Sequence, residues 1–200
     1  MTQTTANTSQ LSLRPPARFL VEKAHALPRG KALDVAAGSG RNTLFLAEQG
    51  WTVHAVDRNH SALATLSAVA RERSLLVVTM GEMDLESRDN PASLFPAAAY
   101  DVVLVFFYLF RPLFPALLHA LKPGGMLLYE TFLVENYLRY QRPRHREFCL
   151  EPGELLRLAP GLEIVHYDEG ERPGRDDGPS TVTARLLARL PGSTGKTNGD

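Results

Sequence analysis

The chain has 200 residues, and its 22 Lys and Arg balance its 22 Asp and Glu, so the formal net charge is zero. This length fits one domain, and the zero net charge excludes a general attraction to nucleic acid or anionic lipid, so either role would need a local basic patch. A single cysteine, Cys149, excludes an internal disulfide framework, and the longest apolar run, residues 102–110, is too short to span a bilayer, so we expect a soluble protein of the cytoplasm.

The two ends of the sequence differ in composition from the rest. Residues 1–10 are rich in Thr, Gln, Asn and Ser and have little to bury, which predicts a disordered tail, and residues 191–200 predict a second one. Residues 11–190 are expected to form a single domain. Its first part alternates apolar strands with amphipathic helices: strands at 31–36, 52–56, 75–80, 101–107 and 126–130, and helices at 42–49, 61–73 and 113–121.

The alternation changes after the fifth strand. A short helix is predicted at 152–158, followed by strands at 162–167 and 181–190. The link at 169–180 is rich in Gly, Pro and charged residues, which predicts a mobile loop. Because no helix separates the last two strands, they are expected to pair antiparallel. The prediction is therefore an α/β fold: a doubly wound, mainly parallel seven-stranded sheet with helices on both faces and a C-terminal antiparallel strand pair.

The stretch ALDVAAGSGRN, residues 32–42, ends the first strand on an acid and continues through a turn of small residues. In open α/β sheets the ligand binds beyond the carboxyl ends of the strands, and Asp34 and Asp57 both lie at such ends. Gly38 and Gly40 let the backbone approach a ligand closely, because neither has a Cβ. Asp57 is placed where a carboxylate accepts two ribose hydroxyls, so a nucleotide cofactor is predicted at this turn.

The charge of Asp34 separates two classes of nucleotide cofactor. A dinucleotide places its pyrophosphate at this turn, which favours the pattern G-x-G-x-x-G and no neighbouring carboxylate. The present turn reads AAGSGRNT, which departs from that pattern, and Asp34 would repel a phosphate. S-adenosylmethionine carries a sulfonium and an ammonium group against one carboxylate, so an acid complements it. The sequence therefore favours S-adenosylmethionine, with a nicotinamide-dependent dehydrogenase as a weaker alternative.

Several segments together resemble the motifs of class I S-adenosylmethionine-dependent methyltransferases, in order and in spacing, across residues 30–132. They are LDVAAGSGRNTLFLAEQG, VHAVDRN, MDLES, YDVVLVF and LKPGGMLLYETF. The family usually has glycine where this chain has Ala36, which should tighten the turn without abolishing it. GRN, with FLAEQGWTVHAVDRN, is most similar to the tellurite-resistance-type methyltransferases, which act on small soft acceptors such as thiols or oxyanions. The resemblance implies a Rossmann-like methyltransferase fold.

The resemblance also implies which residues hold the cofactor. The methionine end would contact the turn after the first strand, with Arg41 as a partner for the cofactor carboxylate or, alternatively, a solvated residue at a helix start. Asp57 and Arg58 would flank the ribose and adenine. Asp84, with the backbone of its neighbours, would take the adenine amino edge, and Phe106 would lie near the sulfonium. The implied cofactor-binding residues are Asp34, Ala36, Gly38, Gly40, Arg41, Asp57, Arg58, Met83, Asp84, Leu85 and Phe106.

Residues after the fourth and fifth strands are candidates for the acceptor side. Tyr108, Arg111 and Glu130 lie at or just past those strand ends and are the predicted catalytic residues. A basic cluster follows that could attract an anionic acceptor or hold the cofactor carboxylate, although an exposed, solvated loop is the simpler explanation and nucleic-acid binding a weaker alternative. Its members are Arg139, Arg142, Arg144, His145 and Arg146. No spacing of His, Cys or carboxylate residues predicts a metal site.

The sequence thus predicts an S-adenosylmethionine-dependent methyltransferase for a small-molecule acceptor, with S-adenosylhomocysteine as product. A thiol, sulfide or chalcogen oxyanion is the favoured acceptor, because a soft nucleophile needs little help from a base. Two alternatives stay open: a C- or O-methyltransferase of quinone or secondary metabolism, which needs a base, and a non-catalytic S-adenosylmethionine-binding protein. The oligomeric state is open too, as is the question whether residues 169–180 or 139–146 form a lid; no membrane partner is expected.

Overall fold

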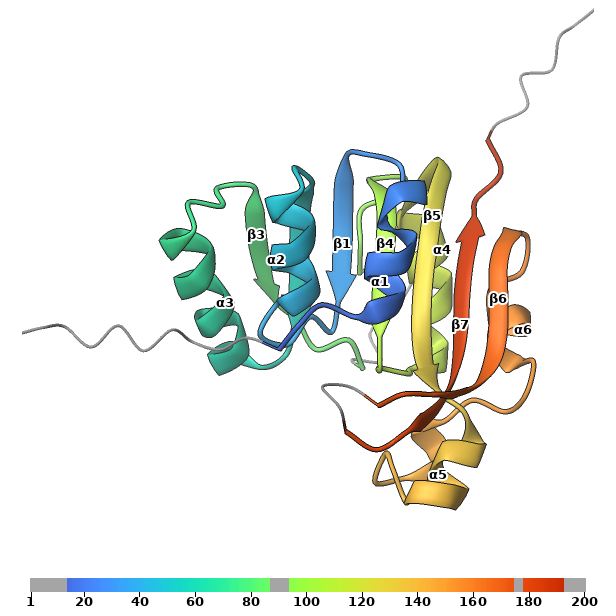
Figure 1. The fold of residues 1–200 in the computed structure, drawn as a ribbon. Coiled ribbons are helices and arrows are strands. Elements are labelled where there is room, and N and C mark those ends of the chain that lie inside the picture. The colour runs from blue at the N-terminus through green and yellow to red at the C-terminus, as the bar shows by residue number, and fades with distance from the viewer. Residues whose placement is uncertain (1–13, 87–93, 175–177, 193–200) are drawn as a thin grey trace, which may run out of the picture.

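The computed structural model describes residues 14–86, 94–174 and 178–192. The strands in these residues are β1 (Lys31–Val35), β2 (Thr52–Asp57), β3 (Val78–Glu82), β4 (Tyr100–Phe106), β5 (Leu121–Phe132), β6 (Glu163–Arg172) and β7 (Thr181–Arg189). They form one sheet in the order β3-β2-β1-β4-β5-β7-β6 (Figure 1). The first five strands are parallel, while β7 runs antiparallel to its neighbours β5 and β6. The predicted fold class is confirmed, whereas the tails predicted at 1–10 and 191–200 lie outside the described residues except for Pro191 and Gly192.

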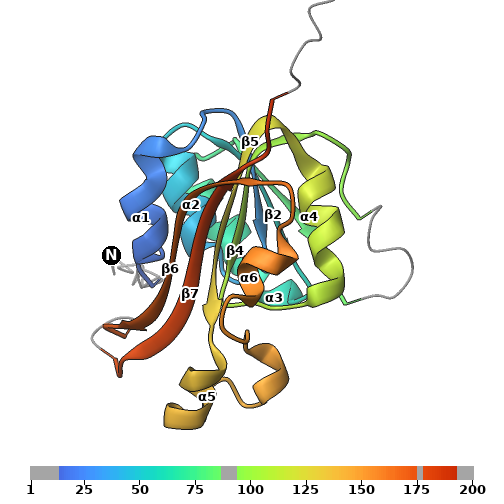
Figure 2. The same ribbon diagram turned by 90° about the vertical axis from the view of Figure 1, so that its right-hand side faces the viewer.

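Helices cover both faces of the sheet. Three lie on one face, α1 (Arg18–Lys23), α2 (Arg41–Glu48) and α3 (His60–Glu72), and two on the other, α4 (Phe114–Ala120) and α6 (Glu154–Leu158) (Figures 1 and 2). The hairpin of β6 and β7 projects beyond the edge of the sheet at which β1 and β5 end, and α5 (Val134–Tyr140) lies beyond the same edge (Figure 1). None of the helices in the described ranges combines the length and the apolar composition that a bilayer-spanning helix needs.

Two helices were not predicted from the sequence. α1 has six residues and α5 seven, and neither has a side-chain hydrogen bond at its N-cap. Isolated helices this short are unstable in water, so their stability comes from tertiary packing. In α1 that packing is the burial of Phe19 and Leu20 against the sheet. Because propensity and capping contribute little to either helix, the sequence carries only a weak signal for them.

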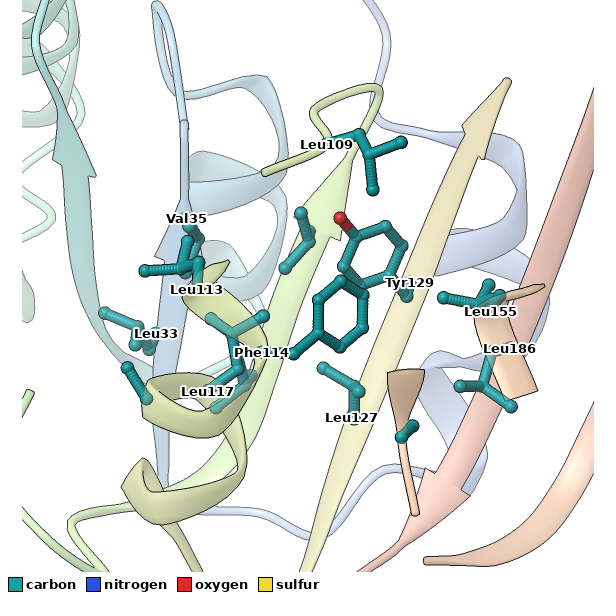
Figure 3. Packing of buried hydrophobic residues seen from close by; sticks show 14 of the residues in the cluster. Leu33, Val35, Leu109, Leu113, Phe114, Leu117, Leu127, Tyr129, Leu155 and Leu186 are labelled. Carbon is teal, nitrogen blue, oxygen red and sulfur yellow. The ribbon is translucent and has the colours of Figure 1, made fainter. Parts of the chain in front are cut away.

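The largest hydrophobic cluster lies between the sheet and the two helices α4 and α6. Figure 3 shows leucines of α4 and β5 packed around the rings of Phe114 and Tyr129, whose centroids are 5.1 Å apart. The Tyr129 hydroxyl donates a hydrogen bond of 2.8 Å to the carbonyl of Tyr108. This bond ties the core to the loop that follows β4, so a residue deep in the sheet holds the backbone at the carboxyl edge.

Three predicted boundaries change in the structure. The strand predicted at 75–80 begins at Val78, because Leu75 still donates its amide to Ala70 at the end of α3. The strand predicted at 126–130 extends from Leu121 to Phe132. The loop predicted from residue 169 is wrong at its start, since β6 pairs with β7 as far as Arg172. Charged side chains are accommodated there by ion pairs, of Arg172 with Asp168 in the same strand and of Glu171 with Arg139, so high polarity does not mean an irregular backbone.

Candidate functional site

The turn after β1 lies at the carboxyl edge of the sheet and has three left-handed residues. Gly38 and Gly40 have φ values of +57° and +79°, and Ala36 has +55°. For a residue with a Cβ this conformation costs about 1–2 kcal/mol, so the turn forms with alanine but under strain. The Gly38 amide donates a 2.8 Å hydrogen bond to Asp57, which joins the turn to the end of β2.

Asp34 forms the buried end of this turn. Its side chain is 1% exposed and accepts a 2.6 Å hydrogen bond from the Thr43 hydroxyl. Burial raises the pKa of Asp34 to about 6, and the Thr43 hydrogen bond and the charge of Arg41 oppose that shift. The carboxylate is therefore mostly ionised at neutral pH but lacks a full counter-charge. It faces a cavity of about 410 Å³, the turn cavity, lined by Arg14, Asp34, Ala36, Ala37, Gly38, Ser39, Arg41, Asn42, Phe106 and Phe107.

A second cavity, of about 300 Å³, opens beside Asp57. The Asp57 carboxylate accepts hydrogen bonds of 2.8 Å from the amides of Gly38 and Asn59, and its own carbonyl accepts one from Met83. We call this the acidic cavity; it is lined by Ala36, Asp57, Arg58, Met83, Asp84, Leu85, Glu86, Phe107, Tyr108, Leu109, Phe132, Pro143 and Phe148. The structure thus brings Asp84 into the same cavity as the neighbouring residues Asp57 and Arg58, from which it is distant in the sequence.

Phe107 connects the two cavities and was not predicted as a site residue. It lines both of them, its φ is +59°, and its ring centroid lies 5.3 Å from that of Phe132. The predicted residue, Phe106, contacts only the turn cavity and is 8% exposed because most of it packs in the core. The left-handed backbone at the strand end turns Phe107 toward the cavities, and no pattern in the sequence reveals that conformation.

A third cavity, of about 550 Å³, lies between the start of α1 and the strands β5, β6 and β7. Arg41 and Phe107 line it as well as the turn cavity, so these two residues form the boundary between the two spaces. Glu130 lines it too, is 7% exposed and accepts a 3.1 Å hydrogen bond from the Thr183 hydroxyl. We call this space the Glu130 cavity.

The structure separates the three predicted catalytic residues. Tyr108 lines the acidic cavity, where burial and then the charge of Glu86 raise the pKa of its hydroxyl, which is buried and has no hydrogen-bond partner among the described residues. Arg111 lies outside the lining of all three cavities. Its guanidinium instead holds the Glu154 carboxylate, at 2.5 and 3.0 Å, and the carbonyls of Glu147 and Cys149. Arg111 thus fastens α6 and the preceding 3-10 helix, Arg146–Phe148, to the body of the fold.

We expect Arg111→Ala to lower the free energy of unfolding by about 2 kcal/mol, because the Glu154 side chain, 14% exposed, would lose its charged partner. Urea denaturation followed by circular dichroism measures the change. Arg146→Ala is the matched control, since its pair with Glu151 is exposed on both sides and should contribute less than about 1 kcal/mol. Equal losses in the two variants would contradict the fastening role of Arg111.

The segment that carries the basic cluster, residues 139–148, contributes apolar side chains to the acidic cavity. Arg139 pairs with Glu135 and Glu171, and Arg146 pairs with Glu151. The residues of this region that line the acidic cavity are Pro143 and Phe148. In the ranges that the structure describes, no group of three or more His, Cys, Asp and Glu side chains is arranged to hold a metal ion.

The site is chemically suited to an adenosyl cofactor with a cationic end. A carboxylate lies at each of two joined cavities, Asp34 beside the turn and Asp57 at the end of β2. A Cβ built on Gly38 would meet nothing within 4 Å, so the turn backbone is open on that side. Carboxylates accept hydrogen bonds from hydroxyl and ammonium groups and repel phosphates. The residues present therefore fit S-adenosylmethionine better than a dinucleotide.

Comparison with known families gives a match over most of the chain. The sequence model of the family "Tellurite resistance protein TehB" matches residues 11–172. Among curated proteins, the chain is 23% identical over 180 residues to "Probable S-adenosyl-L-methionine-dependent methyltransferase TehB" of Haemophilus influenzae. The match covers 86% of this chain and 60% of the relative, so the chain spans about three fifths of the length of that protein.

Solved structures share the fold. The crystal structure of TehB from Haemophilus influenzae has a TM-score of 0.71 at 21% identity, covering 85% of this chain and 60% of that one. A S-adenosylmethionine-dependent methyltransferase from Methanosarcina mazei has a TM-score of 0.67 at 18% identity, with coverages of 84% and 96%. The [4+2]-cyclase SpnF has a TM-score of 0.68 at 20% identity, with coverages of 86% and 78%. Since a cyclase shares this fold, the fold by itself does not establish the reaction.

Proposed function

The chain belongs to the tellurite resistance protein TehB family, and from this premise we propose that it is an S-adenosylmethionine-dependent methyltransferase acting on a small-molecule acceptor. The observation that carries the proposal is the pair of joined cavities with Asp34 at one and Asp57 at the other. When bound, S-adenosylmethionine supplies the methyl group and leaves as a neutral thioether. The task of the protein is then to orient donor and acceptor, which can contribute roughly 7–11 kcal/mol to catalysis.

The residues around the two cavities would divide the cofactor between them. Asp34 would hold the cationic methionine end beside the turn of Ala36, Gly38 and Gly40, and Arg41 would pair with the cofactor carboxylate. In the acidic cavity, the Asp57 carboxylate would accept the ribose hydroxyls. Support for this assignment comes from the shared lining of the cavities and from the ionised but under-neutralised carboxylate of Asp34. The adenine would lie among five other residues that line the acidic cavity: Arg58, Met83, Asp84, Leu85 and Tyr108.

For the acceptor we propose a thiol, sulfide or chalcogen oxyanion, as family membership suggests. A headspace assay with hydrogen sulfide, methanethiol and selenite tests the smallest members of this class, and silence on all three would restrict the proposal to larger thiols. A C- or O-methyltransferase of quinone or secondary metabolism remains the alternative, and it would need a base such as Glu130. A non-catalytic S-adenosylmethionine-binding protein would bind the cofactor yet yield no methylated product from a metabolite extract.

Cofactor binding is tested by calorimetry with S-adenosylhomocysteine. We expect a dissociation constant near the micromolar range, about −8 kcal/mol, and a loss of about tenfold or more in Asp57→Ala. The loss follows because Asp57 would no longer accept the ribose hydroxyls or the Gly38 amide that fixes the turn. Glu82→Ala is the matched control: Glu82 also ends a strand, but it pairs with His60 and does not line the acidic cavity. Absence of binding to both S-adenosylmethionine and S-adenosylhomocysteine would overturn the proposed function.

A further inference from the structure

The floor of the Glu130 cavity is a polar row on an otherwise apolar face of the sheet. Leu128 lies two residues before Glu130 in β5, and Leu187 lies two residues after Arg185 in β7. Both leucines belong to the hydrophobic cluster under α1. The row itself is connected across three strands by hydrogen bonds: Arg172 to Thr183 at 3.1 Å, Thr183 to Glu130 at 3.1 Å, and Arg185 to Asp168 at 2.6 and 2.9 Å. Polar groups are placed here at the expense of apolar packing, which is typical of a binding surface.

The charges in this row form two poles. Arg185 lies opposite Glu130 in the strand register and pairs with both Asp168 and Glu22. Arg172 lies closer to the hairpin end and shares the Asp168 carboxylate, and Arg18 lines the same cavity, so these two guanidinium groups form the positive pole. Burial, followed by the charge of Arg185, lowers the pKa of Arg172, while the charges of Asp168, Glu130 and Glu22 oppose that shift. Glu130 forms the negative pole. The Thr183 hydroxyl accepts from Arg172 and donates to Glu130, so the two poles lie within the length of one small molecule.

The negative pole, Glu130, lies next to the turn cavity, where the methionine end of the cofactor is proposed to bind. The Phe107 amide donates a 2.7 Å hydrogen bond to the Glu130 carbonyl, and Phe107 lines both the Glu130 cavity and the turn cavity. A ligand atom at Glu130 therefore lies on the side of the cavity that borders the proposed methionine end of the cofactor. Besides Glu130, the charged residues that line this cavity are Arg18, Glu22, Arg41, Glu171, Arg172 and Arg185.

We propose that the Glu130 cavity binds the methyl acceptor, and that this acceptor is a small acid carrying its nucleophile as a thiol. This inference rests on the proposed function and narrows its acceptor class. The acceptor carboxylate would pair with Arg172 and Arg18, and the thiol would point to Glu130. A bare oxyanion nucleophile fits this place poorly, because the Glu130 carboxylate would repel it. An ammonium group, with a pKa near 10, would give up its proton to a carboxylate less readily than a thiol, with a pKa near 8.5.

The step balances without a further reactant. The thiol S–H bond breaks and its proton passes to the Glu130 carboxylate, while the thiol sulfur uses an electron pair to bond the methyl carbon. The bond from that carbon to the sulfonium breaks, its electron pair stays on the donor sulfur, and the products are a thioether acid and S-adenosylhomocysteine. Glu130 then returns its proton to water. As a general base, it would matter most below the pKa of the thiol.

The test compares 3-mercaptopropionate with 1-propanethiol, which has a methyl group in place of the carboxylate. For the unmodified protein we expect kcat/KM about tenfold or more in favour of the acid, and in Arg172→Gln a ratio near one, because only the acid uses the guanidinium. Arg172→Lys should keep part of the preference, and Arg18→Gln should lower it if Arg172→Gln fails to fold. Arg189→Gln, an exposed arginine at the other end of β7, is the control and should leave the ratio unchanged.

Glu130→Gln gives a second, independent readout. We expect kcat with 3-mercaptopropionate to fall about tenfold at pH 7 and to recover toward pH 9, where the thiolate forms without a base. Affinity for S-adenosylhomocysteine should not change, since Glu130 does not line the turn or acidic cavity. The inference would be overturned if the protein used the two thiols equally, preferred selenite or β-alanine, or did not turn over the mercapto acid. It would also be overturned if the loss of kcat in Glu130→Gln did not depend on pH. Failure to bind S-adenosylhomocysteine would instead overturn the proposed function.

Discussion

Replacing Asp34 with asparagine is expected to stabilise the cofactor-free protein by about 2–3 kcal/mol at neutral pH. Burial holds the pKa of Asp34 at about 6, well above its ordinary value, so folding at neutral pH forces a charge into a site that favours the neutral acid. Asparagine has nearly the same shape and can still accept the hydrogen bond from Thr43. The variant removes the cost of the charge and keeps the bond.

The sign of the pH dependence follows from the direction of the pKa shift. A carboxyl group whose pKa is raised in the folded state stabilises that state below about pH 4 and loses this contribution as the pH rises through about 6. The difference between Asp34→Asn and the unmodified protein should therefore be small near pH 4 and complete above about pH 7. Urea denaturation at several pH values measures it. A variant no more stable than the unmodified protein at neutral pH would contradict this account of Asp34.

Asp101 provides a control of opposite sign. Although burial acts to raise its pKa, hydrogen bonds from Lys122 and the Lys31 amide, both of 2.8 Å, lower it overall. Asp101 therefore contributes to the stability of the folded state above the ordinary pKa of a carboxyl group, and this stability is lost as the pH falls through the lowered pKa of the folded state. Asp101→Asn should therefore destabilise the protein at neutral pH, where Asp34→Asn stabilises it.

The same Asp34 variant should bind S-adenosylmethionine about tenfold less tightly, because neutral asparagine cannot balance the sulfonium and ammonium charges. Stability and binding would then change in opposite directions, as expected where a binding site keeps a charge that the fold alone would not. Calorimetry on the folded variant measures the affinity. A gain in stability with unchanged affinity would remove Asp34 from the proposed cofactor site while leaving its pKa explained.

Gly40→Ala is expected to lower the free energy of unfolding by about 3–4 kcal/mol, from two additive causes. The φ of +79° at Gly40 disfavours any residue with a Cβ, and that Cβ would lie 2.3 Å from Leu66 Cδ1. Leu66 belongs to α3 and is fully buried in a cluster with Leu44 of α2 and Ala55 of β2, so it cannot move aside without disturbing the core. Thermal or urea denaturation measures the loss.

Gly38→Ala separates these two causes. Its φ is +57°, but a Cβ there would meet nothing within 4 Å, so only the backbone strain of about 1–2 kcal/mol applies. A cost in Gly40→Ala that does not exceed the cost in Gly38→Ala would show that contact with Leu66 is unimportant. If Gly38 approaches the cofactor, Gly38→Ala should also weaken cofactor binding while largely preserving stability.

Much of the fold could be predicted because its signals are local. The central strand β4 is an apolar run, and its residues from Val102 to Val105 are completely buried, as a parallel strand covered on both faces requires. The acids at the ends of β1 and β2 were found in the same way, since parallel strands end at one edge and bring Asp34 and Asp57 close together. Strand periodicity and strand-end position depend on neighbouring residues alone.

The amino-acid sequence by itself determined the α/β fold class but not the order of the strands. It also placed two acids and a glycine turn at strand ends, and a cationic adenosyl ligand is proposed from these residues. The tertiary structure decided the rest of the site: that Phe107 joins the cavities, that Arg111 binds Glu154, and that Glu130 lies in a charged row with Arg172. These facts depend on a left-handed residue at a strand end and on the pairing of β5, β7 and β6, which places side chains from distant segments side by side. Such proximity arises from packing in three dimensions. It cannot be predicted from residue spacing or from hydrophobic periodicity, because both describe only neighbours in the sequence.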